Sequence, residues 1–193
     1  MLVMPVTRLA AFVLVRPHYP ENVGAAARAI KTMGITDFAL VKPGRLAVPE
    51  HEMALKMAVK SWDVLEGARR VESLAEAIDG IELVFATTSR RGVSGIVSPR
   101  RAAEMASAAA AFGRRTAFVF GNEKTGLGEA DLELCGERLR IPMAADQPSI
   151  NLAQAVQIVA YELFLAGLAV RAAAPADVPP TDGGGADGVD SAT

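Results

Sequence analysis

Short apolar stretches alternate with segments of helical periodicity along most of the chain. Apolar stretches that predict buried strands occur at 9–15, 38–41, 83–86, 116–120 and 139–141. Helical segments are predicted at 23–33, 52–59, 98–111, 129–134 and 151–170, with a short one opened by Ser73, and 62–65 is ambiguous. Because strands that alternate with helices form parallel sheets, the pattern predicts an α/β domain whose parallel sheet is flanked by helices.

The composition changes close to the C-terminus. Residues 1–170 form the predicted domain, whereas residues 171–193 are rich in Ala, Pro, Gly and Asp and are expected to form a disordered tail. The formal net charge is −2, but from Arg171 onward there are one Arg and four Asp, which leaves 19 positive and 18 negative side chains before them. A protein of this charge would bind nucleic acid through a local basic patch.

Other features bear on the compartment and on metals. The one cysteine, Cys135, excludes an internal disulfide, and together with isolated His18 and His51 it offers no metal site. The first residues do not have the pattern of a signal peptide. We therefore expect a cytoplasmic protein that needs no metal.

The last predicted helix is unusually apolar. Its longest uninterrupted apolar run, Leu163–Val170, is far shorter than the roughly 20 residues of a membrane span, so no membrane association is expected. Gln154, Gln157 and Tyr161 form one polar stripe, and the remaining positions are mostly apolar. Such a helix is expected to be buried on most sides, against its own sheet or against another subunit.

The stretch 118–127 joins a buried strand to a polar loop. Gly121 ends the strand, Gly126 follows five residues later, and Asn122–Thr125 lie between them. Open α/β sheets bind ligands at loops that follow the carboxyl ends of their strands. The loop is not a phosphate-binding Walker loop, because Gly126 is not followed by Lys and Ser or Thr. A surface turn before a helix remains the alternative.

Two further polar clusters accompany this loop, at Asn22–Arg28 and at Ile141–Met143 followed by Pro148–Leu152. In this order the three clusters resemble the motifs of the SpoU (TrmH-type) RNA ribose 2′-O-methyltransferases of the SPOUT class. The resemblance spans about residues 9–168. Lys31–Ile35 and Ala155–Glu162 make it most similar to the TrmJ branch, which methylates the ribose of tRNA nucleotide 32.

The resemblance implies a fold, an assembly and a cosubstrate. The fold would contain a deep C-terminal trefoil knot, the protein would be a homodimer with its catalytic site at the subunit interface, and S-adenosylmethionine would bind in the knot. The resemblance assigns its binding to Thr87, Thr88, Ser89, Gly121, Ile141, Ser149, Ile150 and Leu152. This assignment is chemically consistent, because adenine needs apolar walls and unpaired backbone groups at its edge.

The resemblance also implies a set of catalytic residues: Arg28, Asn22, Glu123, Ser149 and Asn151. A guanidinium hardly deprotonates, so we expect Arg28 to clamp a substrate phosphate and orient the 2′-hydroxyl, and the proton acceptor is left open. Asn22 could equally be only the cap of its helix. We expect Glu123 to orient Arg28 or loop amides, whereas Ser149 and Asn151 could cap the last helix and also line the site.

Arg90 and Arg91 follow the first cofactor loop and are the best candidates for contacts with RNA phosphates, unless they reflect only an arginine-rich composition. Longer TrmJ proteins add a helical extension that helps dimerise and hold tRNA, where this chain has an acidic tail. Ribosomal RNA is therefore an alternative substrate to tRNA. A non-catalytic RNA-binding protein that keeps the fold is the third alternative.

Overall fold

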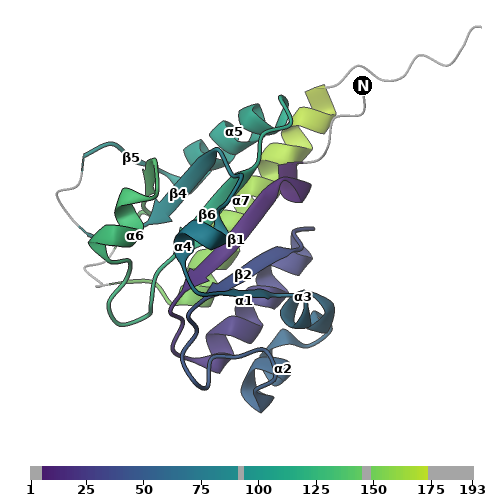
Figure 1. The fold of residues 1–193 in the computed structure, drawn as a ribbon. Coiled ribbons are helices and arrows are strands. Elements are labelled where there is room, and N and C mark those ends of the chain that lie inside the picture. Colours follow the sequence, from purple (N-terminus) through teal and green to yellow (C-terminus); the bar gives the residue numbers. More distant parts are fainter. Residues whose placement is uncertain (1–5, 91–93, 145–148, 174–193) are drawn as a thin grey trace, which may run out of the picture.

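The computed structural model describes residues 6–90, 94–144 and 149–173. Within them, seven strands form one parallel sheet in the order β3-β2-β1-β6-β4-β7-β5 (Figure 1). The strands are β1 (Ala10–Val15), β2 (Asp37–Val41), β3 (Arg69–Val71), β4 (Leu83–Thr87), β5 (Ile96–Val97), β6 (Thr116–Phe120) and β7 (Glu137–Leu139). The parallel sheet predicted from the alternation of elements is confirmed.

Helices cover both faces of this sheet. They are η1 (Val6–Arg8, a 3-10 helix), α1 (Pro20–Thr32), α2 (Glu52–Ala58), α3 (Trp62–Glu66), α4 (Leu74–Ala77), α5 (Pro99–Ala110), α6 (Glu129–Glu133) and α7 (Leu152–Ala173). Residues of α1, α2, α3, α5 and α7 share one hydrophobic core with the sheet, and residues of α4 and α6 share the other (Figure 1). The molecule therefore has three layers, as the predicted flanking helices require.

The central strands β1 and β6 are buried on both faces. Phe12 and Leu14 of β1 point into the larger core, while the alternate residues of the strand belong to the smaller one. The ring of Phe118 lies 5.3 Å from that of Phe12 and 5.2 Å from that of Phe85. Because such strands leave little room for polar side chains, their polar residues are few, and Thr116 at the start of β6 is the buried exception among the described residues of these two strands.

Close helix packing fixes the direction of α1. A side chain at Gly24 would overlap the backbone of Ala54 in α2, so the two helices touch backbone to backbone at this point. The predicted start at Ser73 is confirmed, since its hydroxyl accepts a hydrogen bond from the amide of Glu76, and Ser98 caps α5 in the same way through the amide of Arg101. Local sequence signals therefore set several helix starts.

The structure corrects some predicted boundaries. The last strand, β7, ends at Leu139 and so precedes most of the predicted stretch 139–141. The strands β3 and β5 were not predicted, because three and two residues are too short to show a pattern. The ambiguous residues 62–65 lie in the helix α3.

The helix α7 differs from its prediction in length and burial. It continues through Ala173, so the predicted boundary at residue 170 falls inside it, and residues 174–193 of the predicted tail lie outside the described part of the chain. It is long and apolar enough to cross a membrane by length and composition alone. In the single chain it is not buried on most sides, because Tyr161, Phe164 and Leu168 are 48%, 36% and 42% exposed.

Candidate active site

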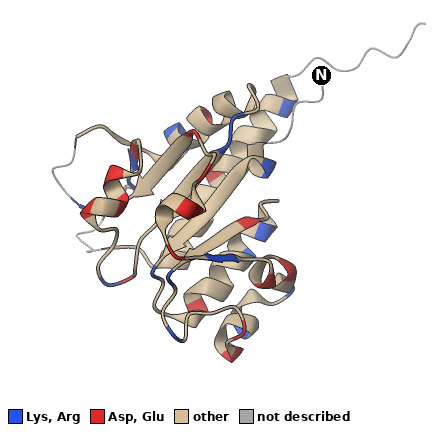
Figure 2. Ribbon diagram, viewed as in Figure 1, with Lys and Arg blue, Asp and Glu red and all other residues tan. Residues whose placement is uncertain are grey.

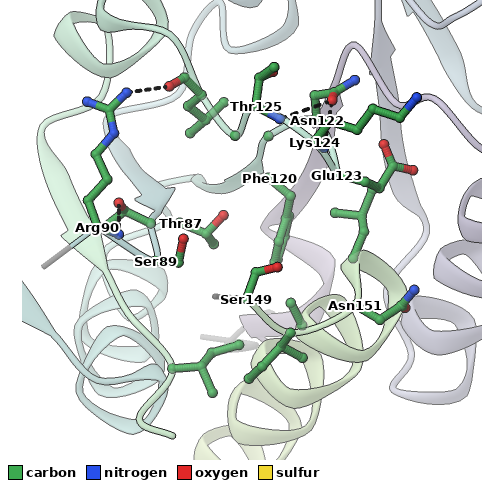
Figure 3. Close-up of a pocket in the computed structure, with 18 of the residues that line it drawn as sticks. Thr87, Ser89, Arg90, Phe120, Asn122, Glu123, Lys124, Thr125, Ser149 and Asn151 are labelled. Atoms are coloured by element: carbon green, nitrogen blue, oxygen red, sulfur yellow. Dashed lines mark hydrogen bonds between the residues drawn. The ribbon is translucent and has the colours of Figure 1, made fainter. Parts of the chain in front are cut away.

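An open cavity of about 400 Å³ lies at the carboxyl ends of β4, β6 and β7. Three segments that are distant in sequence line it: the loop after β4, the loop after β6, and residues leading into α7 (Figure 3). All eight residues predicted to bind the cofactor are among the lining residues: Thr87, Thr88, Ser89, Gly121, Ile141, Ser149, Ile150 and Leu152. The structure thus brings together the second and third motifs, the loop after β4, and Asn22 from the first motif.

The loop after β4 is held by hydrogen bonds to neighbouring strands. The hydroxyl of Thr87 donates to the carbonyl of Val119 at 3.0 Å, and the amide of Thr88 donates to the carbonyl of Leu139 at 2.9 Å. The hydroxyl of Thr88 accepts from the amide of Arg90 at 3.1 Å. Ser89 is exposed, so its side chain is more accessible to a ligand than the two threonine hydroxyls.

The loop after β6 doubles back tightly. A side chain at Gly121 would overlap the backbone of Gly126 and Leu127, and Gly126 adopts a φ of 69° that favours glycine. The side chain of Asn122 accepts hydrogen bonds from the amides of Lys124 and Thr125 at 2.8 and 3.3 Å. The alternative interpretation of this stretch, a surface turn before a helix, does not account for its place in the cavity wall.

The residues leading into α7 contact α1 through the side-chain amides of Asn151 and Asn22. The side-chain oxygen of Asn151 accepts from the amides of Ala153 and Gln154 at 3.0 and 3.2 Å, so Asn151 caps α7. Its nitrogen donates to the side-chain oxygen of Asn22 at 3.0 Å. Asn151 therefore caps the helix and lines the cavity at once, whereas Ser149 lies two residues before the cap and is exposed at the cavity.

The structure corrects one interpretation of Asn22. The helix α1 begins at Pro20 after Tyr19, so Asn22 is the third residue of the helix and is not its cap. Its side chain is 8% exposed and donates to the carboxylate of Glu123 at 2.8 Å. Pro20 gives the physical reason, because proline is favoured at the first position of a helix.

Glu123 anchors the start of α1. Its carboxylate accepts from the backbone amides of His18 and Tyr19 at 2.8 and 3.3 Å, in addition to the side chain of Asn22. Of the two roles predicted for Glu123, the structure shows the orientation of backbone amides. Arg28 is not among the contacts of Glu123 within the described residues.

Arg28 does not line the cavity of its own chain. It is exposed on α1, six residues beyond Asn22. At 1.5 Å and 100° per residue it lies about 9 Å further along the axis and is turned about 120° away. Arg28 is therefore exposed to solvent outside the cavity.

Arg90 lines the cavity, and Arg91 falls outside the described residues. The guanidinium of Arg90 forms an ion pair with Glu129 and donates to the carbonyl of Leu127 at 3.4 Å. Half of the Arg90 side chain is exposed, so this pair is weak in water. A contact between Arg90 and an RNA phosphate stays a prediction. It requires Arg90 to leave Glu129 and pair with the phosphate.

Sequence reasoning missed Tyr19 and Lys124 as cavity residues. The stretch 16–20 was interpreted only as the end of the first strand. An aromatic residue directly before Pro20, which starts the helix, could have indicated Tyr19. Among the described residues, no three His, Cys, Asp or Glu side chains gather closely enough to hold a metal ion.

Residues 10–161 match the SpoU rRNA Methylase family, which decides the family. The chain belongs to this family. The tRNA (cytidine/uridine-2′-O-)-methyltransferase TrmJ of Escherichia coli is 38% identical over 160 residues, which cover 82% of this chain and 64% of that protein. The chain thus spans just under two thirds of this curated SpoU relative.

Solved structures agree with this SpoU assignment. TrmJ from Z. mobilis has a TM-score of 0.72 and 35% identity, covering 81% of this chain and 69% of that one. The SpoU methyltransferase AviRb from Streptomyces viridochromogenes, in complex with AdoMet, has a TM-score of 0.65 at 22% identity, covering 84% and 62%, and shares the fold. The predicted family is confirmed, and TrmJ proteins are among its relatives.

Proposed function

We propose that this protein is an S-adenosylmethionine-dependent RNA methyltransferase that methylates a ribose 2′-hydroxyl of tRNA, at cytidine or uridine 32. The observation that carries the proposal is a single cavity lined by Asn22 of the first SpoU motif and by residues of the other two motifs, with all eight candidate cofactor residues in its wall. The activity named for the E. coli relative supports tRNA as the substrate.

The cavity fits S-adenosylmethionine. Its volume lies in the range of small-molecule sites, and Ile141, Ile150 and Leu152 provide apolar walls for an adenine. At Gly121 a Cβ would overlap the backbone of Gly126 and Leu127 in the same loop, and all three residues line the cavity. When bound, this cosubstrate would supply an electrophilic methyl group.

The polar residues would position the RNA. Holding a hydroxyl in line with the methyl group contributes up to about 7–11 kcal/mol in the best cases. Arg28 would hold a phosphate through two parallel hydrogen bonds and thereby orient the ribose. Glu123 and Asn22 would keep the start of α1 in place beside the cavity, through the hydrogen bonds that they form. Arg90 and Arg91 would contact phosphates nearby.

We further propose that the protein is a cytoplasmic homodimer. The exposed apolar side chains of α7, including Phe164 and Leu168, support a subunit interface on this helix. Arg28 points away from the cavity of its own chain, which supports its delivery to the cavity of the partner. Membership of the SpoU family supports a deep trefoil knot that includes the segment leading into α7.

Two measurements test the proposed activity. Isothermal titration calorimetry should detect binding of S-adenosylmethionine, and the protein should incorporate labelled methyl groups into tRNA from a strain that lacks its gene. Mapping ribose methylation in that strain should show loss at nucleotide 32 of tRNA. Absence of cosubstrate binding and of methyl transfer would favour the non-catalytic RNA-binding alternative.

Ribosomal RNA is the second candidate substrate. The description of the matching family, SpoU rRNA Methylase, favours it. The same mapping, extended to ribosomal RNA, separates the candidates: loss of a ribosomal methylation with intact tRNA would overturn the tRNA assignment while leaving the methyltransferase activity in place.

A further inference from the structure

One exposed aromatic side chain lies at the edge of the cavity. Tyr19 lines the cavity, and 43% of it is accessible to solvent. It is the N-cap residue of α1, directly before Pro20, which is followed by the polar residues Glu21 and Asn22. An aromatic ring that is exposed beside a polar cavity has an apolar face available for a flat ligand.

The backbone of Tyr19 is held firmly. Its amide donates to one carboxylate oxygen of Glu123 at 3.3 Å, and the amide of His18 donates to the other at 2.8 Å. Pro20 restricts the preceding residue to extended conformations, and Tyr19 has φ −106° and ψ 126°. The point from which the ring projects is therefore fixed before any ligand binds, which lowers the entropic cost of a contact.

Neighbouring side chains brace the ring and add a positive charge. The imidazole of His18 meets it edge to face, with ring centroids 4.7 Å apart and planes at 88°. The ammonium of Lys124 lies 5.5 Å from the Tyr19 ring centroid and 3.0 Å from Nε2 of His18, where it can donate to a neutral imidazole. A cation beside an aromatic ring matches a nucleotide, which offers a phosphate beside a flat base.

We propose that Tyr19 is a stacking platform for an unstacked nucleobase of the substrate RNA, with Lys124 bound to an adjacent phosphate. Proteins recognise single-stranded RNA by stacking splayed bases on aromatic side chains and by neutralising the backbone with cations. The site rests on the proposed function, because it names how the RNA substrate of that cavity is held.

The chemistry of stacking sets what this platform does. Every base has a π-face, so stacking on Tyr19 raises affinity for RNA without choosing between bases. Loss of the ring should therefore weaken binding of RNAs carrying cytidine or uridine at the target by equal factors. The tyrosine hydroxyl is dispensable in this arrangement, and a phenylalanine should replace it.

The experiment compares Tyr19→Ala with Tyr19→Phe. Fluorescence anisotropy with labelled tRNA measures RNA affinity, steady-state methylation measures KM and kcat, and calorimetry measures S-adenosylmethionine affinity. Tyr19→Ala should weaken RNA binding and raise the KM for tRNA by about tenfold, as loss of one stacked base does, with unchanged cosubstrate affinity. Tyr19→Phe should retain wild-type values in all three measurements.

Two further variants sharpen the test. Phe112→Ala removes a ring that is 83% exposed and precedes the amino end of β6, whereas the cavity lies at the carboxyl end; this variant should change nothing. Lys124→Gln should reduce the salt dependence of RNA binding by the equivalent of about one phosphate contact.

The outcomes that overturn this proposal differ from those that overturn the proposed function. If Tyr19→Ala keeps the wild-type RNA affinity and KM, the stacking role of Tyr19 is contradicted, while the proposed methyl transfer is unaffected. A selective loss of S-adenosylmethionine affinity in Tyr19→Ala would assign the ring to the cosubstrate and also overturn the platform. A wild-type protein that methylates no RNA would instead end the proposed function.

Discussion

The polar side chains of the site act on one another across long distances in sequence. Glu123 contacts Asn22, and Asn22 contacts Asn151, although these pairs are 101 and 129 residues apart in the chain. The sequence motifs predicted all three residues but not their pairing, because periodicity carries no information about contacts between distant loops. The cap assigned to Asn22 was wrong for a local reason, since the signal from Pro20 was overlooked.

At this scale, Arg28→Ala tests the phosphate clamp. We expect a loss of methyl transfer of about 100-fold or more, because the reacting hydroxyl is no longer aligned. Affinity for S-adenosylmethionine should stay within a few-fold of wild type, since Arg28 lies outside the cavity wall of its chain. The exposed Arg114 provides a matched control, and Arg114→Ala should behave as wild type. Activity of Arg28→Ala near the wild-type level would remove the residue from the mechanism.

Cys135 gives a prediction about pH. Burial raises the pKa of its thiol to about 11, and the thiol donates to the carbonyl of Asp131 at 3.2 Å. Folding favours the protonated thiol, so this contribution to stability is complete below the unfolded pKa of about 8.5 and is lost as pH rises toward 11.

Denaturant unfolding of wild type and Cys135→Ala between pH 8 and 11 measures this effect. The free energy of unfolding should fall more steeply with pH in the wild type than in the variant. The native thiol should also react much more slowly with a thiol reagent at pH 8 than the unfolded chain does. Parallel pH profiles and equal reactivity would contradict the assignment.

Elements with a strong local signal were predictable, and short ones were not. The strand β6 was predicted with its observed limits, and α5 was predicted from Ser98 and Pro99 to within one residue of its end. The strands β3 and β5 exist because neighbouring strands complete their hydrogen bonds, which is a tertiary cause that a short window cannot reveal. The loop after β6 was recognised from its two glycines, of which Gly126 has a positive φ and Gly121 leaves space for the returning backbone.

This loop supports a prediction for Gly121→Ala. The added methyl group would overlap the backbone of Gly126 and Leu127, so the loop must move out of the cavity wall. We expect affinity for S-adenosylmethionine to fall by about tenfold or more, by calorimetry, and the thermal midpoint to drop. Gly136→Ala is the matched control, because a Cβ there meets open space. Equal affinities for the two variants would show that the tight turn does not shape the cavity.

The whole molecule distributes its charge evenly, and its exposed apolar surface is concentrated in a few places. Figure 2 shows acidic and basic residues interspersed over the ribbon, as expected from the near-neutral composition of the domain. The order of the strands could not be predicted from sequence, because parallel neighbours need not be consecutive. The sequence also left open whether α7 is buried in its own core or by another chain, because the pattern of one chain cannot distinguish the two.

The proposed dimer is tested by light scattering after size-exclusion chromatography. The wild type should have twice the mass of one chain, and Leu168→Asp should shift it toward the monomer, because a charge would be buried at the interface. Leu134→Asp alters a residue of similar exposure just after α6, on the other face of the sheet, and should leave the mass unchanged. A monomeric wild type, or one that floats with lipid vesicles, would contradict the proposal.

The contact between Asn22 and Asn151 bears on biosynthesis. A ribosome releases the first helix long before it has made Asn151, so the amide of Asn22 meets only water at that stage. The cavity is therefore completed late in synthesis, because Ser149, Ile150, Asn151 and Leu152 of its wall are among the last described residues to be made. A nascent chain of this protein would be unable to bind the proposed methyl donor until α7 had left the exit tunnel.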